Sequence, residues 1–276
     1  MMRSMASPSP VLTSFANPRV KAAGALRDRR QRDRTGLTLI DGARELRRAL
    51  EAGVTVVEAF VCEPLLAGPD ARAVFDRLRA KGTTLHTTSE PLFAKLAFGE
   101  RAEGIVAVVQ IPTTRLDDLV LPPVPLVVVI EGVEKPGNVG ALLRSADGAG
   151  VDAVVVASPR TDLFNPNAIR ASAGTIFSVP LAAAATADVI AWLRARSIRI
   201  VATRVEAERL YTATDLRGPV AIVVGAEDDG LTNAWTAPDV DAVRLPMLGM
   251  ADSLNVSVSG AVLLYEARRQ RGLPTE

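Results

Sequence analysis

Near its carboxyl terminus the chain reads RLPMLGMADSLNVSVSGAVLLYE over residues 244–266. This stretch passes from the apolar end of a short strand, through a loop with proline and glycine, into a helix. Pro246 stops strand pairing because it has no N–H to donate, and Gly249 gives the loop backbone freedom. Apolar residues then recur at helical spacing, and Ser253 is positioned to cap the helix. The stretch therefore predicts a strand, a polar loop and a helix over residues 253–269.

The first turn of this predicted helix is polar, with Ser253, Asn255, Ser257 and Ser259. Free N–H groups at a helix start, together with small polar side chains, suit a polar ligand. Taken alone, the segment is equally compatible with an ordinary buried C-terminal helix that has a serine cap. The choice between these two interpretations depends on the rest of the chain.

Two further strand-to-helix turns carry glycine and polar residues. One reads EGVEKPGNVGALLRSADGAGVDAVVV over residues 131–156, and the other reads VVGAEDDGL over residues 223–231. Together with residues 244–266, and in this order, they resemble the three motifs of the SpoU/TrmH family of RNA ribose methyltransferases. The resemblance is strong from residue 126 to residue 266 and looser in the N-terminal part.

The composition limits the classes of function. The 276 residues leave room for two domains, and the net charge of +1 means that any basic surface for nucleic acid must be local. Cys62 alone cannot form an internal disulfide and is predicted to be a small buried hydrophobe. His86, the only histidine, is predicted to lie on an edge strand or loop, and with one cysteine it cannot build a His/Cys zinc site. The 4% aromatic content argues against a base-stacking RNA platform.

The sequence shows no membrane or secretion signal. No apolar run approaches the ~20 residues needed to cross a bilayer, and the N-terminus lacks the apolar core of a signal peptide. Residues 1–16 are predicted to be a disordered lead-in, and the protein is predicted to be cytoplasmic.

Residues 17–111 alternate between short strand and helix patterns, which predicts a small α/β domain. The family resemblance implies that this domain binds the RNA substrate. Its first helix is predicted to run from the Asn17 cap and Pro18 to about Arg34. Basic residues dominate this helix, and those expected to contact RNA are Arg19, Lys21, Arg27, Arg29, Arg30 and Arg32. The planar fork of arginine fits phosphate, which favours contact with the RNA backbone. The alternative interpretation is that these residues form an ordinary solvated helix face.

Residues 112–125 (PTTRLDDLVLPPVP) are predicted to be a partly stiff interdomain linker. Residues 126–276 then repeat strand, turn and helix, with near-continuous apolar strands typical of a parallel sheet covered on both faces. The predicted strands are 126–130, 151–157, 198–202 and 220–224, with short ones near 179 and 243, and the predicted helices are 139–149, 166–173, 187–196 and 253–269. Such a sheet is also typical of proteins that bind a dinucleotide cofactor. However, Gly132, Gly137 and Gly140 do not match the glycine spacing of the NAD fingerprint.

The family resemblance implies S-adenosylmethionine as the methyl donor, bound in a deep trefoil knot formed by the C-terminal segment. The residues that it assigns to this cofactor are Thr203, Gly225, Glu227, Gly230, Leu245, Met247, Gly249 and Leu254. Leu245 and Leu254 are expected to sandwich the adenine, and Gly225 is expected to let the backbone approach the ligand closely. For Glu227, a solvated loop acid is the alternative to a ligand or dimer contact.

The implied reaction is attack of a ribose 2′-hydroxyl on the sulfonium methyl group. Arg144 matches the arginine that the family places at this step, but arginine is normally always protonated. We therefore expect Arg144 to position phosphate and stabilise the oxyanion, and the proton acceptor is left open. Asn138 is expected to orient Arg144 or the ribose, to cap a helix, or both, while Ser253 and Asn255 complete the pocket. Arg170 matches an arginine of relatives that modify ribosomal RNA, and it is interpreted as a substrate phosphate contact or a surface residue.

The sequence thus predicts an α/β protein whose parallel-sheet methyltransferase domain follows a smaller RNA-binding domain. The predicted activity is S-adenosylmethionine-dependent 2′-O-methylation of RNA by a homodimer, and no metal is implied. Ribosomal RNA is the favoured target over transfer RNA. A catalytically silent RNA- or ribosome-binding module on the same fold is the other alternative, and the presence of all the motif residues speaks against it.

Overall fold

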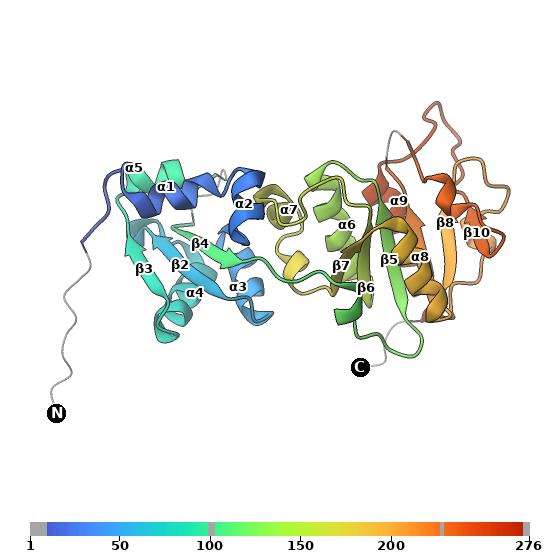
Figure 1. Ribbon diagram of the computed structural model, residues 1–276, viewed down its shortest axis with the longest axis horizontal. Coiled ribbons are helices and arrows are strands. Elements are labelled where there is room, and N and C mark those ends of the chain that lie inside the picture. Colours follow the sequence, from blue (N-terminus) through green and yellow to red (C-terminus); the bar gives the residue numbers. More distant parts are fainter. Residues whose placement is uncertain (1–9, 99–102, 227–228, 273–276) are drawn as a thin grey trace. The chain divides into compact units, whose positions relative to one another are not determined.

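The computed structural model describes residues 10–98, 103–226 and 229–272, and the chain divides after Ile111 into two compact units (Figure 1). Of the predicted lead-in, residues 1–9 lie outside the described residues. Residues 10–16 are not simply disordered, because Leu12 pairs with the edge of the first sheet through a 2.8 Å hydrogen bond from its N–H to the carbonyl of Thr87. None of the helices in the described ranges is long and apolar enough to cross a membrane.

The first unit is a four-stranded sheet with helices on both faces. Its strands are β1 (Leu37–Asp41), β2 (Val56–Val61), β3 (Thr84–Thr87) and β4 (Ile105–Gln110), in the order β1-β4-β2-β3. One face packs against α1 (Pro18–Ala25) and α5 (Glu90–Leu96), and the other is covered by α3 (Ala43–Glu51) and α4 (Gly68–Ala80) (Figure 1). Cys62 is buried in the core and His86 lies on the edge strand β3, so both predictions are confirmed.

The Arg-rich segment forms two helices rather than the one that was predicted. Asn17 caps α1 as expected, but α1 ends at Ala25 and a second helix, α2, runs over Arg29–Thr35. Asp28 causes the second start, because its side chain accepts a 2.9 Å hydrogen bond from the N–H of Arg30. Gly36 ends α2 with a left-handed φ of 66°.

The second unit is a six-stranded sheet in which every neighbouring pair is parallel. Its strands are β5 (Leu126–Glu131), β6 (Ala153–Ala157), β7 (Leu181–Ala184), β8 (Arg199–Thr203), β9 (Val220–Val224) and β10 (Val240–Val243), in the order β10-β8-β9-β5-β6-β7. The predicted parallel sheet is therefore confirmed. From β5 the chain moves outward through β6 and β7, and then crosses to β8 on the opposite side. Ligands of open parallel sheets bind beyond the carboxyl ends of the strands, near such a crossing.

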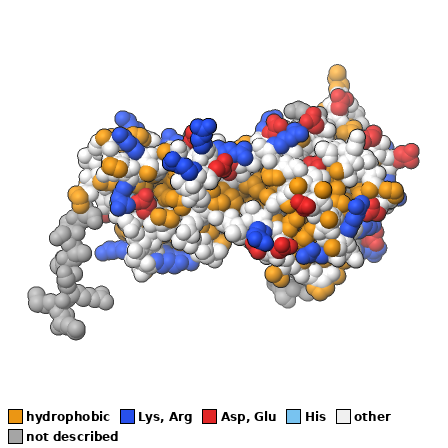
Figure 2. Space-filling view, in the orientation of Figure 1, with side chains coloured by type: hydrophobic (Ala, Val, Ile, Leu, Met, Phe, Trp, Pro, Cys, Tyr) orange, Lys and Arg blue, Asp and Glu red, His pale blue; other side chains and the backbone are white. Residues whose placement is uncertain are grey.

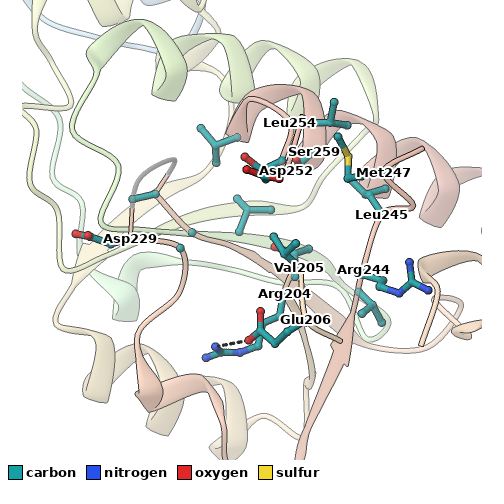
Figure 3. Close-up of a pocket in the computed structure, with 18 residues that line it drawn as sticks. Arg204, Val205, Glu206, Asp229, Arg244, Leu245, Met247, Asp252, Leu254 and Ser259 are labelled. Atoms are coloured by element: carbon teal, nitrogen blue, oxygen red, sulfur yellow. Dashed lines mark hydrogen bonds and ion pairs between the residues drawn. The ribbon is translucent and has the colours of Figure 1, made fainter. Parts of the chain in front are cut away.

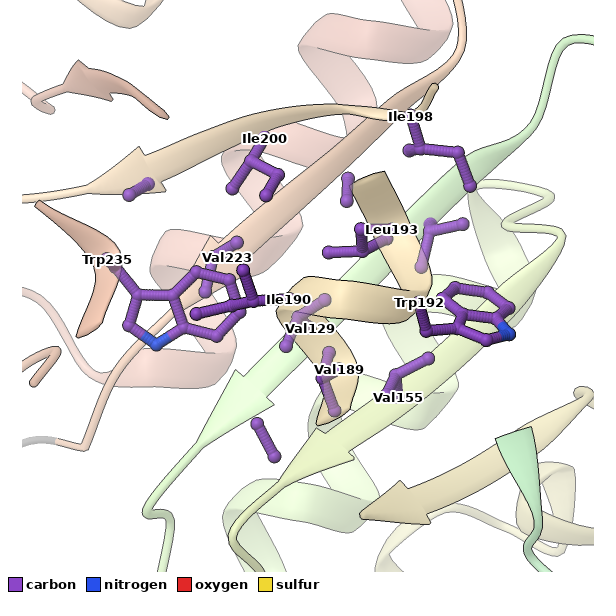
Figure 4. Close-up of a cluster of buried hydrophobic side chains, with 14 of the residues drawn as sticks. Val129, Val155, Val189, Ile190, Trp192, Leu193, Ile198, Ile200, Val223 and Trp235 are labelled. Atoms are coloured by element: carbon purple, nitrogen blue, oxygen red, sulfur yellow. The ribbon is translucent and has the colours of Figure 1, made fainter. Parts of the chain in front are cut away.

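Helices cover both faces of this sheet. One core, shown in Figure 4, lies between the sheet and α8 (Thr186–Ala195), with Trp192 and Trp235 as its largest side chains. On the other face, α6 (Pro136–Gly148) packs against both α7 (Pro166–Ala171) and α9 (Val256–Arg271), and α9 packs against β5 and β9. The strand order does not by itself establish the trefoil knot, which stays a prediction.

Residues 112–125 pack against the second unit along part of their length. The carbonyl of Thr114 accepts a 2.8 Å hydrogen bond from the N–H of Ala183, and three leucines (Leu116, Leu119 and Leu121) pack against the α8-side core. These residues group with the second unit, which spans 112–276. A linker was predicted because this segment is rich in proline and lacks periodicity. Its isolated leucines were the sign in the sequence that part of it is buried.

The C-terminal helix α9 is fastened at its end by arginine. Arg271 donates hydrogen bonds to the carbonyls of Val124 at 3.1 Å, Pro125 at 3.1 Å and Leu216 at 2.9 Å. Burial of this guanidinium lowers the pKa of Arg271 from its ordinary value. Val124 and Pro125 lead into β5, so these hydrogen bonds hold the end of α9 against the start of the central strand. They thereby help to position the whole of α9, including its first turn.

Candidate functional site

A pocket of about 360 Å³ opens at the carboxyl ends of three parallel strands (Figure 3). Its walls are the segments that follow β8, β9 and β10, together with the loop that leads into α9. The lining residues are Thr203, Arg204, Val205, Glu206, Val224, Gly225, Ala226, Asp229, Gly230, Val243, Arg244, Leu245, Met247, Asp252, Ser253, Leu254, Val256 and Ser259. The size suits a small organic ligand.

Most of the predicted cofactor residues lie together in this pocket. Those that line it are Thr203, Gly225, Gly230, Leu245, Met247 and Leu254, joined by Ser253 from the predicted catalytic set. Gly249 lies in the same loop but is not part of the lining, and Glu227 lies outside the described residues. The prediction for Gly249 as a cofactor contact is thus not supported by the lining of the pocket.

Several lining residues carry charge and were missed by the sequence reasoning. Arg204 and Glu206 form an ion pair at 3.3 Å, and Figure 3 shows this pair at the opposite end of the pocket from Asp252 and Leu254. The pKa of Glu206 is lowered by a hydrogen bond from its own backbone N–H and, more weakly, by Arg204. A usable signal existed, because residues directly after the carboxyl end of a parallel strand are the expected place for ligand contacts.

Gly225 lines the pocket and also has a structural role within its own loop. A Cβ at this position would lie 2.4 Å from the carbonyl carbon of Gly230 and 2.6 Å from the backbone nitrogen of Leu231. The loop also closes through a 3.0 Å hydrogen bond from the N–H of Gly230 to the carbonyl of Ala226. Gly225 is therefore required by the close approach of two parts of the same loop, whose far side lines the pocket.

The polar residues of α6 and α9 meet at the starts of these helices. The Asn255 side-chain amide donates to Oδ1 of Asn138 at 3.3 Å. The predicted caps need correction: Asn255, not Ser253, caps α9, and its Oδ1 accepts from the N–H of Ser257 at 3.0 Å. Asn138 is not a cap either, because α6 already begins at Pro136.

Arg144 lies in the middle of α6, with an exposed side chain, and does not line the pocket. Among the described residues it forms no ion pair or hydrogen bond. Arg170 is half-buried on α7, which approaches α6 so closely that a Cβ on Gly140 would lie 2.6 Å from the Cβ of Ala171. The structure thus places Asn138 and Asn255 together and leaves Arg144 outside the pocket wall.

The arginines of α1 and α2 divide into structural and exposed groups. Arg32 is 1% exposed and donates to the carbonyl of Leu26 at 2.6 Å, so its predicted RNA contact is corrected. Arg27 caps α5 by donating to three carbonyls and lies over the ring of Phe98 at 5.7 Å. Arg19 pairs with Glu58 at 3.1 Å.

The remaining basic side chains of this surface are exposed. They are Lys21, Arg29, Arg30 and Arg34, of which Arg29 pairs with Asp33 at 3.6 Å, and Arg19 and Arg27 are exposed as well despite their contacts. Figure 2 shows Lys and Arg side chains over the α1 and α2 region of the first unit. This part of the surface is accessible to an anionic partner, unlike the buried Arg32.

Comparison with known proteins identifies the second unit. A model of the SpoU rRNA Methylase family matches residues 125–265, and a model of an MRM3-like substrate binding domain matches residues 17–107. This chain belongs to the SpoU rRNA methylase family. The resemblance recognised from the three motifs is therefore confirmed.

Named relatives of this family member modify ribosomal RNA. The 23S rRNA (guanosine-2′-O-)-methyltransferase RlmB of Pectobacterium atrosepticum is 35% identical over 75% of this chain and 89% of its own length. The 23S rRNA (uridine(2479)-2′-O)-methyltransferase of Streptomyces viridochromogenes is 31% identical over 89% of this chain and 87% of its own length.

Solved structures agree with this assignment. An RNA 2′-O ribose methyltransferase is 44% identical, with a TM-score of 0.84 over 95% of this chain and 99% of its own. The SpoU methyltransferase AviRb from Streptomyces viridochromogenes, solved in complex with the cofactor AdoMet, is 30% identical, with a TM-score of 0.84 over 92% of this chain and 98% of its own.

Proposed function

We propose that this chain transfers a methyl group from S-adenosylmethionine to a ribose 2′-hydroxyl of ribosomal RNA. The observation that carries the proposal is the pocket at the carboxyl ends of β8, β9 and β10, which is lined by residues of two of the three family motifs. The remaining motif, residues 131–156, contains Asn138, which accepts a hydrogen bond from the side chain of Asn255. Asn255 follows the lining residues Ser253 and Leu254. Relatives that carry these motifs are named 23S rRNA 2′-O-methyltransferases.

The chemistry of the pocket fits S-adenosylmethionine. Apolar side chains of Leu245, Met247 and Leu254 offer surfaces for an adenine ring, and the backbone after each strand offers donors and acceptors. Of the lining acids, Glu206 pairs with Arg204 and Asp229 pairs with Arg160, so Asp252 is the acid proposed to attract the sulfonium or ammonium group of the donor. When bound, this cofactor supplies an electrophilic methyl group.

The polar pair at the starts of α6 and α9 is proposed to hold the target ribose. Asn138 and Asn255 orient each other through their amides, and Ser253 lies in the adjoining pocket wall. Arg144, six residues further along α6, is proposed to bind phosphate and to stabilise the oxyanion that forms as the hydroxyl loses its proton. Because arginine stays protonated, the proton acceptor is another group.

The exposed basic side chains of the first unit are proposed to bind the RNA backbone. Of the predicted set only Arg32 is buried, and Lys21, Arg29 and Arg30 are the exposed residues least engaged in contacts with the rest of the unit. Arg170, which is half-buried beside α6, stays in the proposal as a phosphate contact near the catalytic end. The match to a substrate binding domain over residues 17–107 supports this division of roles.

We also propose that the protein acts as a homodimer. The loop before α9 and one side of α9 expose apolar side chains, with Leu248 97% exposed, Met250 102%, Val258 47% and Tyr265 53%. Val258 and Tyr265 are seven residues apart and so share one helix face. A second copy of this surface would cover these groups and complete the site near Arg144. No group of side chains suited to a metal was found among the described residues.

The direct test is ribose methylation mapping of ribosomal and transfer RNA from cells with and without the protein, followed by transfer of a radiolabelled methyl group to the identified RNA in vitro. One ribosomal 2′-O-methylated nucleotide that is absent without the protein is the expected result. Modification confined to transfer RNA would replace the substrate in this proposal. Binding of RNA without any methyl transfer would establish the silent-module alternative instead.

A further inference from the structure

Glu131 is a buried acid that the proposed mechanism does not use. It is the last residue of β5, at the edge of the sheet where the pocket opens, and it is 2% exposed. Its Oε1 accepts hydrogen bonds from the hydroxyls of Thr186 at 2.7 Å and Thr232 at 3.0 Å, and its Oε2 accepts from the backbone N–H of Thr232 at 2.8 Å. Within the described part of the chain, this carboxylate forms no ion pair with Lys or Arg.

Thr232 connects this acid to the wall of the pocket. Its N–H is held by Glu131, while its carbonyl accepts a 2.8 Å hydrogen bond from the Nη2 of Arg204, a pocket-lining residue. Two residues earlier, Gly230 lines the pocket and lies against Gly225. The position of Glu131 therefore fixes one end of the segment whose other end forms the pocket wall.

We propose that Glu131 is a positioning residue for the methyl donor. By holding Thr232 from the N–H side, it keeps the Gly230–Thr232 segment in the shape that the donor requires, so that binding does not have to order the segment. The proposal rests on the proposed function, because it takes this pocket to be the S-adenosylmethionine site. Glu131 does not line the pocket and makes no contact with the donor in this scheme.

The geometry assigns the role to hydrogen bonding rather than to charge. Both partners of Oε1 are hydroxyls, which can either donate or accept, whereas the partner of Oε2 is an N–H that can only donate. A glutamine with its oxygen at the Oε2 position would therefore satisfy all three contacts, because its NH₂ group can donate to the two hydroxyls. Removing the acceptor altogether would take away both hydrogen bonds that tie Thr232 to β5, including the one from its N–H.

The test compares Glu131→Ala with Glu131→Gln in the full-length protein. S-adenosylmethionine binding is measured by calorimetry, and kcat and KM for the donor are measured with the target RNA in its unmethylated form. We expect Glu131→Ala to weaken donor binding about tenfold or more and to raise the donor KM more than it lowers kcat, since the reacting groups are untouched. Glu131→Gln is expected to stay within about twofold of the unaltered protein, since it keeps all three contacts.

Two control variants separate positioning from general stability. Thr186→Val removes one partner of Glu131 without touching Thr232, and it is expected to leave donor affinity unchanged. Leu193→Ala, in the α8-side core, lowers stability away from the pocket and is expected to lower the melting temperature without a selective rise in donor KM. A rise in KM that merely follows melting temperature across all four variants would overturn the positioning role.

The remaining outcomes are equally decisive. Weak donor binding by a folded Glu131→Gln protein would show that charge matters, and it would refute the hydrogen-bond role. If Glu131→Ala does not fold, Thr232→Val takes its place, because it removes the hydroxyl hydrogen bond to Glu131 and keeps the one from the N–H. We expect this variant to bind the donor about threefold more weakly. Unchanged binding would contradict the inference. An unaltered protein that binds no S-adenosylmethionine would overturn the proposed function, whereas normal binding with an unaffected Glu131→Ala overturns only the role of Glu131.

Discussion

The substitution Gly225→Ala tests the loop that forms one wall of the pocket. The added methyl carbon would lie 2.4 Å from the carbonyl carbon of Gly230, 2.5 Å from its oxygen and 2.6 Å from the nitrogen of Leu231. Contacts this short require movement, and all three atoms belong to the backbone, so no flexible side chain can yield. Overpacking of this kind costs about 1–3 kcal/mol. Because Leu231 is anchored in the core at 7% exposure, we expect the pocket-lining side of the loop to move.

The assay is calorimetric binding of S-adenosylmethionine together with a thermal melt of the same sample. We expect this strain energy to weaken donor binding rather than to unfold the protein. At about 1.4 kcal/mol per factor of ten, it then corresponds to a loss of donor affinity of roughly five- to a hundredfold. Gly137→Ala is the matched control, because a Cβ at Gly137 in α6 meets nothing within 4 Å and the residue lacks a positive φ. We expect it to bind the donor normally. Equal affinities for the two alanine variants would refute the argument from loop closure.

Three further predictions concern the reaction, the RNA and the dimer. Arg144→Ala is expected to bind donor normally but to lower single-turnover methyl transfer about 10²-fold, with little rescue by Arg144→Lys; near-normal transfer would remove it from the mechanism. Replacing Lys21 and Arg30 with alanine should reduce the salt slope of RNA binding by roughly 1–2, whereas Arg72 and Arg79 on α4 should matter less. Val258→Asp should yield monomers in sedimentation, and Val120→Asp, at an 89% exposed position, should not.

Much of the sheet could be predicted because its strands are continuous apolar runs. Val220–Val224 was predicted to the residue, since Pro219 and Gly225 bound it closely. Helix starts were less accurate, because several residues near each start are good caps. Ser253 and Asn255 both qualify by residue type, and only the tertiary position of α9 selects Asn255.

Residue type alone could not separate structural from exposed arginines. Arg30 and Arg32 are two positions apart in α2, yet one is exposed and the other is 1% exposed with its guanidinium against the carbonyl of Leu26. The difference arises from the turn between α1 and α2, which brings the carbonyl of Leu26 to the guanidinium of Arg32. A charge run therefore indicates a basic surface, but the side chains that form it are known only after the chain has folded.

Glu131 shows what kind of signal such reasoning overlooks. The run LVVVIE ends in an acid, and an acid at the carboxyl end of a central parallel strand faces the edge where ligands bind. Burying this carboxylate carries a desolvation cost, and an apolar side chain would avoid that cost if packing were the only need. The three donors that converge on it, two of them from Thr232, explain its presence as the support of a loop. The pocket is accordingly built in two layers, with lining residues after the strands and an acceptor behind them that holds the lining in place.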